Sequence, residues 1–237
     1  LASLCFTSHS ASAALVDAWR ANDLNALDNG DAVGAWNSAS NRVGSAVVGS
    51  QPTLLKNATL SGDSAVQFNA SQLTIASSPV AGLTAFSLVA VLKVDQPGVN
   101  EASQWYGKSG IVDAEQGGVV NDWGMVVGSA GELGFGSGNP DQTLYLSNQP
   151  TYPSVVDGKY HVLVCTWGGG NQTMYLDNLP VKTGSAATSA RNNAGLSFGG
   201  INTGEATRRF IGSLSEVQFY NTALTGLEAT NLITQLA

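Results

Sequence analysis

The stretch that most constrains the fold of this chain lies at residues 209–236. After Gly212, apolar residues approximately alternate with polar ones, at Leu214, Val217 and Phe219. This period of two predicts a half-buried strand with one break near the glycine. Thr225 and Glu228 then stand at the spacing of a helical capping box, and leucines at 227, 232 and 236 predict an apolar helical face. We therefore expect a long closing strand followed by a short docked helix.

Upstream, the chain consists of short apolar runs separated by turn-forming residues. The longest run, Phe86–Val94, is almost continuously apolar and is expected to be a central strand. Gly128–Gly131 and Gly168–Asn171 each separate two such runs, which predicts two hairpins. No charge run, proline-rich linker or internal repeat interrupts the pattern, so residues 14–237 are expected to form one domain. Two packed antiparallel sheets suit this pattern better than a barrel or an α/β fold.

Several segments resemble, in the same order, the laminin-G-like jelly rolls of the concanavalin A-like superfamily. The closing strand from Phe210 to Leu224 fits the family pattern F-x-G-x-φ-x-E-φ-x-φ-Y-N-x-x-L, where φ is apolar. Further matching segments lie at residues 15–20, 30–36, 51–53, 65–68, 86–91, 157–162 and 174–178. The resemblance implies an all-β, two-sheet antiparallel jelly-roll β-sandwich with one short C-terminal helix. Activity does not follow from such a fold alone.

Residues 1–13 are expected to be a leader or linker, since they stand apart from this pattern. Ala11-Ser12-Ala13 fits the small-x-small pattern of a signal-peptide end, although no basic region precedes it. The alternative is a linker from a preceding domain of a larger polypeptide. Cys165 lies in an apolar run and is expected to be buried, while its pairing with Cys5 is left open. No run reaches the roughly 20 apolar residues of a membrane span, and we expect an extracellular or cell-surface protein.

The net charge and the absence of known catalytic motifs argue against several classes of function. A net charge of −7 argues against nucleic acid or an anionic membrane as partner. Related laminarinase-type hydrolases carry an E-φ-D-φ-φ-E strand; here Asp113 and Glu115 have the spacing but lack a third carboxylate. The Gln-Ile-His or Gln-Val-His strand of related alginate lyases is absent, and His161 lies in a strand that is expected to be part of the core, where a structural role is expected. A non-catalytic module is therefore expected, with a polysaccharide-degrading hydrolase or lyase as the alternative.

A polar cluster in residues 109–143 is the candidate metal site. Related jelly rolls show a similar succession, L-V-D-x-E…N-D-[FW]-G…G-x-G-x-P-D-x-T. Calcium prefers about six to eight oxygen ligands, which carboxylate and amide groups supply. If the two loops meet, a structural calcium ion is expected at Asp113, Glu115, Asp122, Asn139 and Asp141. The alternative is that these residues are ordinary turn formers.

Aromatic residues near these loops are the candidate ligand-binding residues. Sugars stack their C–H faces on aromatic rings while polar neighbours bind the hydroxyls. The candidates are Trp105, Tyr106, Trp123, Tyr145 and Tyr152; the alternative for each is packing in the core. The sequence thus favours a recognition module for a glycan or an extracellular protein partner. A structural, assembly or adhesion module is the remaining alternative.

Overall fold

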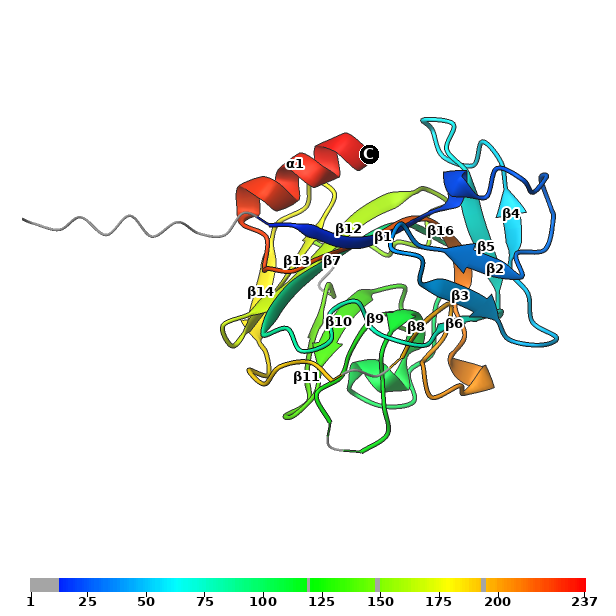
Figure 1. Ribbon diagram of the computed structural model, residues 1–237. Coiled ribbons are helices and arrows are strands. Elements are labelled where there is room, and N and C mark those ends of the chain that lie inside the picture. Colours follow the sequence, from blue (N-terminus) through cyan, green and yellow to red (C-terminus); the bar gives the residue numbers. More distant parts are fainter. Residues whose placement is uncertain (1–12, 119, 148–149, 193–194) are drawn as a thin grey trace, which may run out of the picture.

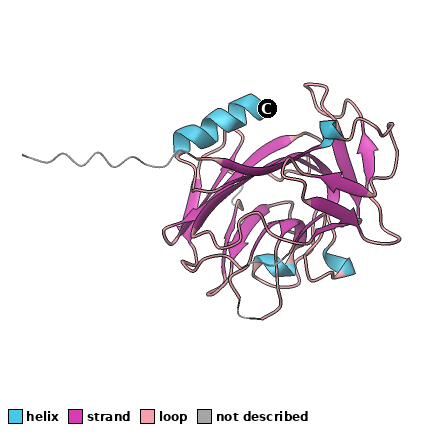
Figure 2. Ribbon diagram, in the orientation of Figure 1, coloured by secondary structure: helices cyan, strands magenta, loops and turns pink. Residues whose placement is uncertain are grey.

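The computed structural model describes residues 13–118, 120–147, 150–192 and 195–237. Within these residues, two antiparallel sheets face each other, and one α-helix, α1 (Gly226–Leu236), lies on the outside of the first sheet (Figures 1 and 2). The predicted two-sheet sandwich with a C-terminal helix is therefore confirmed. None of the helices in this part of the chain is long and apolar enough to cross a membrane.

The first sheet is built around the two longest strands. Its order is β14 (Lys182–Ser185), β13 (Asn171–Leu176), β12 (His161–Gly168), β7 (Ala85–Val94), β16 (Ile211–Tyr220), β5 (Ala65–Asn69) and β4 (Thr53–Leu55), with β1 (Leu15–Arg20) also paired to β16. The predicted central strand is β7, which pairs with both β12 and β16.

The second sheet carries the segments that contain most of the candidate site residues. Its order is β11 (Gln142–Tyr145), β10 (Leu133–Ser137), β9 (Trp123–Val127), β8 (Ser109–Asp113), β15 (Leu196–Phe198), β6 (Leu73–Ile75), β3 (Val43–Ala46) and β2 (Ala35–Asn37). In the described part of the chain, three short 3₁₀ helices lie between strands: η1 (Ala21–Asp23), η2 (Trp105–Gly107) and η3 (Ala206–Arg208).

Both predicted hairpins are present. The β12–β13 turn passes through Gly169 and Gly170, whose φ angles of 60° and 77° lie in the left-handed region. Such a two-residue turn with positive φ at both positions matches the twist of the strands it joins. The β9–β10 hairpin turns over Gly131, also at positive φ.

The closing strand β16 differs from the sequence expectation in where it breaks. The register shift lies between Leu214 and Glu216, rather than at Gly212. One extra residue at the bulge reverses the phase of alternation. As a result Leu214, Val217 and Phe219 can all be buried in the core between the sheets.

The outer face of the first sheet is also apolar, because α1 covers it. Val89 and Val91 of β7 and Val162 and Val164 of β12 belong to a second buried cluster with Leu224, Ala229 and Ile233. Burial on both faces explains why β7 has a continuous apolar sequence.

The helix begins as predicted, with Thr225 and Glu228 forming a reciprocal capping box. Its buried face agrees with the prediction in part, since Leu232 and Leu236 pack against the second buried cluster. Leu227 is 73% exposed, while Ala229 and Ile233 make the buried contacts. Cys165 is completely buried between the sheets; its suggested partner Cys5 lies outside the described residues, so their pairing stays open.

Candidate functional site

The candidate site is a group of acidic side chains with one tyrosine, which we call the rim cluster: Tyr106, Asp113, Glu115, Asp122 and Asp141. These residues come from η2, the end of β8, the segment that follows it, the residue before β9, and the β10–β11 turn. Mutual electrostatic effects connect all five groups. The second sheet and its connecting loops therefore bring four of the five predicted metal ligands into one place.

Asp113 is the buried anchor of the rim cluster. Its Oδ1 accepts hydrogen bonds from the backbone N–H of Glu115 at 2.9 Å and of Asn202 at 2.8 Å. Its Oδ2 is buried and has no hydrogen-bond partner. Burial raises the pKa of Asp113 to about 7, and the charges of Asp122 and Glu205 act in the same direction.

Glu115 and Asp122 face each other beside this anchor. Burial, the charges of Asp122 and Asp113, and a hydrogen bond with Asp122 raise the pKa of Glu115 well above its ordinary value. Burial likewise raises the pKa of Asp122, although its Oδ2 accepts the Gln116 backbone N–H at 3.0 Å. Glu115 Oε2, like Asp113 Oδ2, is buried without a partner. Two carboxyl groups in contact need a proton or a cation between them.

Tyr106 and Asp141 form the more exposed side of the cluster. Tyr106 is half-buried and hydrogen-bonds to Asp141, and burial together with the charge of Asp141 raises the pKa of its phenol. Asn139, the fifth predicted ligand, is exposed and donates its side-chain N–H to Asn121 Oδ1 at 2.9 Å. No set of three His, Cys, Asp or Glu side chains among the described residues has the geometry of a metal site.

The predicted aromatic ligand residues are mostly unavailable to a sugar, which corrects that expectation. Trp105 and Trp123 are 0% exposed, and Tyr152 is 8% exposed. Trp123 packs between the sheets against Phe86 at 5.3 Å, measured between ring centroids. Tyr145 is half-buried, and its hydroxyl donates to the Ser103 carbonyl at 2.8 Å. Tyr106 is thus the predicted aromatic residue that combines partial exposure with contact to the carboxylates.

Trp105 is buried because the second sheet has two glycines where its indole ring packs. Gly124 of β9 and Gly136 of β10 are paired across the strands. A Cβ at Gly124 would lie 2.5 Å from the Trp105 ring and 2.1 Å from Asp113 Oδ2, and one at Gly136 would lie 2.3 Å from the ring. The absence of side chains at these glycines lets the indole lie on the strands. Glycines on both arms of the hairpin predicted about Gly128–Gly131 are the sequence signal that could have revealed it.

Arg191 is a buried residue that hydrogen-bonds to the backbone of the loops carrying the rim cluster. It was not identified from the sequence. It is 2% exposed, and its guanidinium carbon lies 4.2 Å from the centroid of the Trp167 ring. Its Nη1 donates to the Asp122 carbonyl at 2.9 Å and to the Gly138 carbonyl at 3.4 Å, while Nε and Nη2 donate to the Ser189 carbonyl. Arg191 therefore ties together the two loops that carry Asp122 and Asp141.

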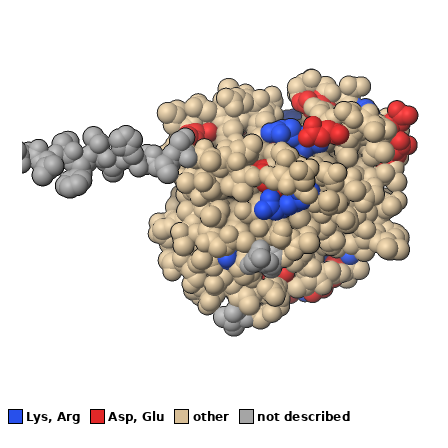
Figure 3. Space-filling model, in the orientation of Figure 1, with Lys and Arg blue, Asp and Glu red and all other residues tan. Residues whose placement is uncertain are grey.

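A second feature missed by sequence reasoning is a hollow of about 450 Å³ on the outer face of the first sheet. It lies between the C-terminal end of α1, the β4–β5 loop and the residues that precede β12. Its lining includes Leu60, Val91, Tyr160, Val162 and Leu236. Figure 3 shows that charged side chains are sparse on the face drawn and that acidic and basic atoms gather near this end of α1.

Comparisons with known proteins place the chain in a family. Residues 60–230 match the laminin-G-like family described as the concanavalin A-like lectin/glucanases superfamily. The chain belongs to this family, which confirms the resemblance found in its sequence. Among curated protein sequences, none matches this chain.

Solved structures with the same fold share little sequence with it. Domain 4 of AbnA, an extracellular family GH43 arabinanase from Geobacillus stearothermophilus determined with arabinotriose, is 16% identical, with a TM-score of 0.67 over 93% of this chain and 98% of that one. The binding domain of botulinum neurotoxin DC, determined with SialylT, is 13% identical with a TM-score of 0.60. The chain covers 52% of that structure, and 94% of the chain is matched. At these identities the comparisons show the shared fold.

Proposed function

We propose that this protein is a non-catalytic recognition module that binds a glycan at the rim cluster. The observation that carries the proposal is the presence of two buried, unpartnered carboxylate oxygens, on Asp113 and Glu115, in the same cluster as the half-buried Tyr106. The Tyr106 ring offers an apolar face to a sugar, and Glu115 and Asp141 accept hydrogen bonds from its hydroxyls.

Two of the similar structures support a glycan as the ligand class. The arabinanase domain was determined with an arabinose oligosaccharide and the toxin domain with a sialylated one. The arabinanase is extracellular, which supports an extracellular or cell-surface location and a role as one module of a larger polypeptide for this chain. A protein partner is the second candidate, since the binding domain of the same toxin was also determined with rat synaptotagmin II.

We further propose that a calcium ion neutralises the rim cluster. Asp113, Glu115 and Asp122 would supply acidic oxygens after a local rearrangement, because no three such side chains of the described residues have metal-site geometry as they stand. The exposed Asp141 and the Asn139 amide lie on the adjoining loop. Calcium takes oxygen ligands in flexible geometry and fills the remaining positions with water. A sugar with neighbouring hydroxyls would displace such waters. The cation and the sugar would then bind cooperatively.

Titration of arabino-oligosaccharides and sialyl-oligosaccharides by calorimetry, in calcium and in chelator, tests the proposal. Calcium is expected to raise the melting temperature by several degrees, because it binds only the folded state. Tyr106→Ala is expected to weaken the sugar at least tenfold, equal to about 1.4 kcal/mol. Glu115→Gln is expected to remove the calcium response.

Asp23→Asn is the matched control for Glu115→Gln, because Asp23 is an exposed carboxylate in η1, which packs on the first sheet. Asp23→Asn should change neither the binding of calcium nor the binding of the oligosaccharides. Sugar binding that persists in chelator would remove calcium from the proposal and leave the glycan function. Absence of binding to every oligosaccharide would refute the glycan function and favour a protein partner.

A further inference from the structure

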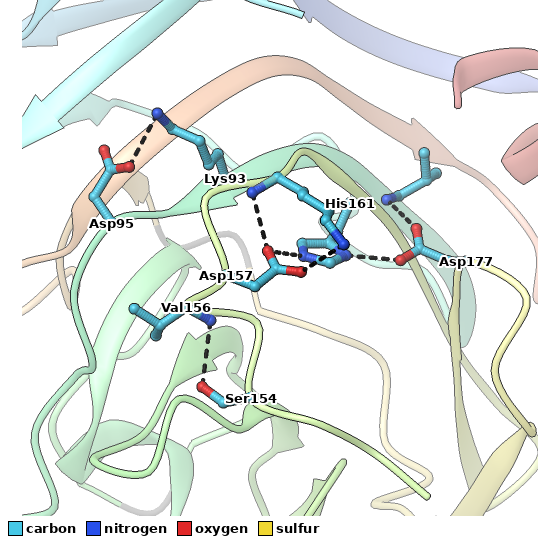
Figure 4. A network of polar contacts seen from close by, with 9 residues as sticks. Lys93, Asp95, Ser154, Val156, Asp157, His161 and Asp177 are labelled. Carbon is cyan, nitrogen blue, oxygen red and sulfur yellow. Dashed lines mark hydrogen bonds and ion pairs between the residues drawn. The ribbon is translucent and has the colours of Figure 1, made fainter. Parts of the chain in front are cut away.

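His161 lies between two carboxylates at one corner of the first sheet (Figure 4). Its Nδ1 is 2.7 Å from Asp177 Oδ2, and its Nε2 is 3.1 Å from Asp157 Oδ1. His161 begins β12 and Asp177 follows β13, so this contact closes the open end of the β12–β13 hairpin. Asp157 belongs instead to the segment that leads from the second sheet into β12.

The arrangement requires a charged imidazole. An ionised carboxylate only accepts hydrogen bonds, and a neutral imidazole has a single N–H to donate. Both contacts can be hydrogen bonds only when both ring nitrogens carry protons. In the neutral ring, one nitrogen lone pair would face a carboxylate oxygen and repel it.

The groups around His161 determine which of its two carboxylate contacts breaks when the imidazole loses a proton. Asp177 is held within the hairpin, where its Oδ1 accepts the Val162 backbone N–H at 2.8 Å. Asp157 is held by its own segment, through the Lys159 backbone N–H at 2.9 Å and the Lys159 ammonium at 3.6 Å. The Nε2 contact to Asp157 is the longer of the two, so it is the one expected to break.

The remaining charged groups at this corner do not replace the imidazolium. Lys93 at the end of β7 pairs with Asp95 at 3.0 Å, and Lys159 is already beside Asp157. Burial of His161 opposes its charge, but the hydrogen bonds and charges of Asp177 and Asp157 outweigh burial and raise its pKa. The proton is therefore retained above the pH at which an exposed histidine loses it.

Asp157 stands where two hollows meet. The hollow of about 450 Å³ is lined by Gly158, Lys159 and Tyr160, and a smaller one of about 250 Å³ by residues 153–155, Asp157 and His161. Asp177 and Asn178 line both. The segment 153–160 thus forms the wall between them, and its attachment to His161 fixes that wall.

We propose that His161 is a proton-operated latch, which when charged ties the segment 153–160 to the β12–β13 hairpin and when neutral releases it, loosening the wall between the two hollows. The latch is independent of the rim cluster, which lies on the other sheet.

Two amides report on the two sides of the latch. The Lys159 N–H depends on Asp157, and the Val162 N–H depends on Asp177. As pH rises through the His161 midpoint, the hydrogen-exchange protection factor of Lys159 is expected to fall about tenfold, a change of ~1.4 kcal/mol in local opening. That of Val162 is expected to stay within about twofold.

The midpoint itself is measured by NMR of the imidazole nitrogens in the full chain. The sequence contains two histidines, His9 and His161, so His9→Gln leaves a single signal. A midpoint above the ordinary value of about 6.5 is expected. Asp157→Asn should lower it, while Asp95→Asn, which removes the same charge at the same corner without touching His161, should not.

Either of two results would overturn the latch. The first is a His161 midpoint at or below the ordinary value. The second is a Lys159 protection factor that is unchanged across the midpoint, or that falls together with that of Val162. The second result would mean that the two carboxylates are held by the fold rather than by the proton.

Discussion

Replacement of Arg191 by methionine tests the role that the structure gives to this buried guanidinium. Methionine keeps an unbranched apolar stem against Trp167 but removes every donor. The Ser189 and Gly138 carbonyls lose their Arg191 donors, whereas the Asp122 carbonyl keeps the Gly138 backbone N–H at 2.9 Å. Hydrogen bonds from a charged donor contribute about 1.5–3 kcal/mol each.

The expected loss in the free energy of unfolding is smaller than the summed contributions of the lost hydrogen bonds. Removal of a buried charge also removes its desolvation penalty, and burial already lowers the pKa of Arg191 to about 10. Two carbonyls without a donor and the lost cation–π contact are therefore expected to destabilise the protein by about 3–4 kcal/mol. For a domain of this size this corresponds to a melting temperature lower by roughly 6–16 °C.

Urea unfolding in chelator measures this change, with two comparison variants. Arg191→Lys keeps the charge but not the planar fork and should cost about half as much. Arg20→Met removes the same side chain from a partly exposed ion pair with Glu216, whose N–O distance is 2.7 Å, and should cost about 1 kcal/mol or less. A cost for Arg191→Met no larger than that for Arg20→Met would refute the reasoning.

Three shorter predictions follow from single contacts. Gly124→Ala should cost about 1–3 kcal/mol in urea unfolding, because its methyl would press on Asp113 and Trp105, while Gly117→Ala, with open space around it, should cost less than about 0.5 kcal/mol. Thr225→Ala should destabilise the protein by about 0.5–2 kcal/mol through loss of the α1 cap. The raised pKa of His161 stabilises the fold fully below the unfolded-state value of about 6.5. This stabilisation should disappear as pH rises through the folded-state pKa. His161→Gln should reduce the pH dependence of unfolding between these values by the His161 contribution and leave the contributions of Asp113 and Glu115, whose pKa values are also raised.

Local patterns predicted the elements of the fold well, and tertiary contacts decided their details. The alternation in β16 and the Thr225–Glu228 spacing are properties of neighbouring residues, so they could be recognised directly. The position of the bulge could not, because the extra residue is accommodated by pairing with β7. The exposure of Leu227 follows from how α1 docks on β7 and β12, which its own sequence does not specify.

At the candidate site, too, local patterns predicted some features and tertiary contacts decided the others. The carboxylates expected to converge do lie together, because β8, β9 and the β10–β11 turn are neighbours in one sheet; their binding of calcium stays a prediction. The expected exposure of Trp105 was wrong. Its polar sequence neighbours suggested exposure, and the signal to the contrary, Gly124 and Gly136, lies in a different part of the chain. Arg191 is more than fifty residues from the loops that it holds, and no local pattern connects them.

Two groups of carboxylates among the described residues have opposite electrostatic situations: one faces a charged group of the chain, and the other is neutralised by protons or by an added cation. At the corner of the first sheet, Asp157 and Asp177 both face the His161 imidazolium, so the negative charge is matched within the chain. In the rim cluster, Arg191 donates to the Asp122 backbone rather than to a carboxylate, and burial raises the pKa of both Asp113 and Glu115. Near neutral pH these groups need protons or a cation from outside the chain. The folded protein should therefore take up protons at the rim cluster in chelator and release them when calcium is added, which a weakly buffered pH measurement would detect.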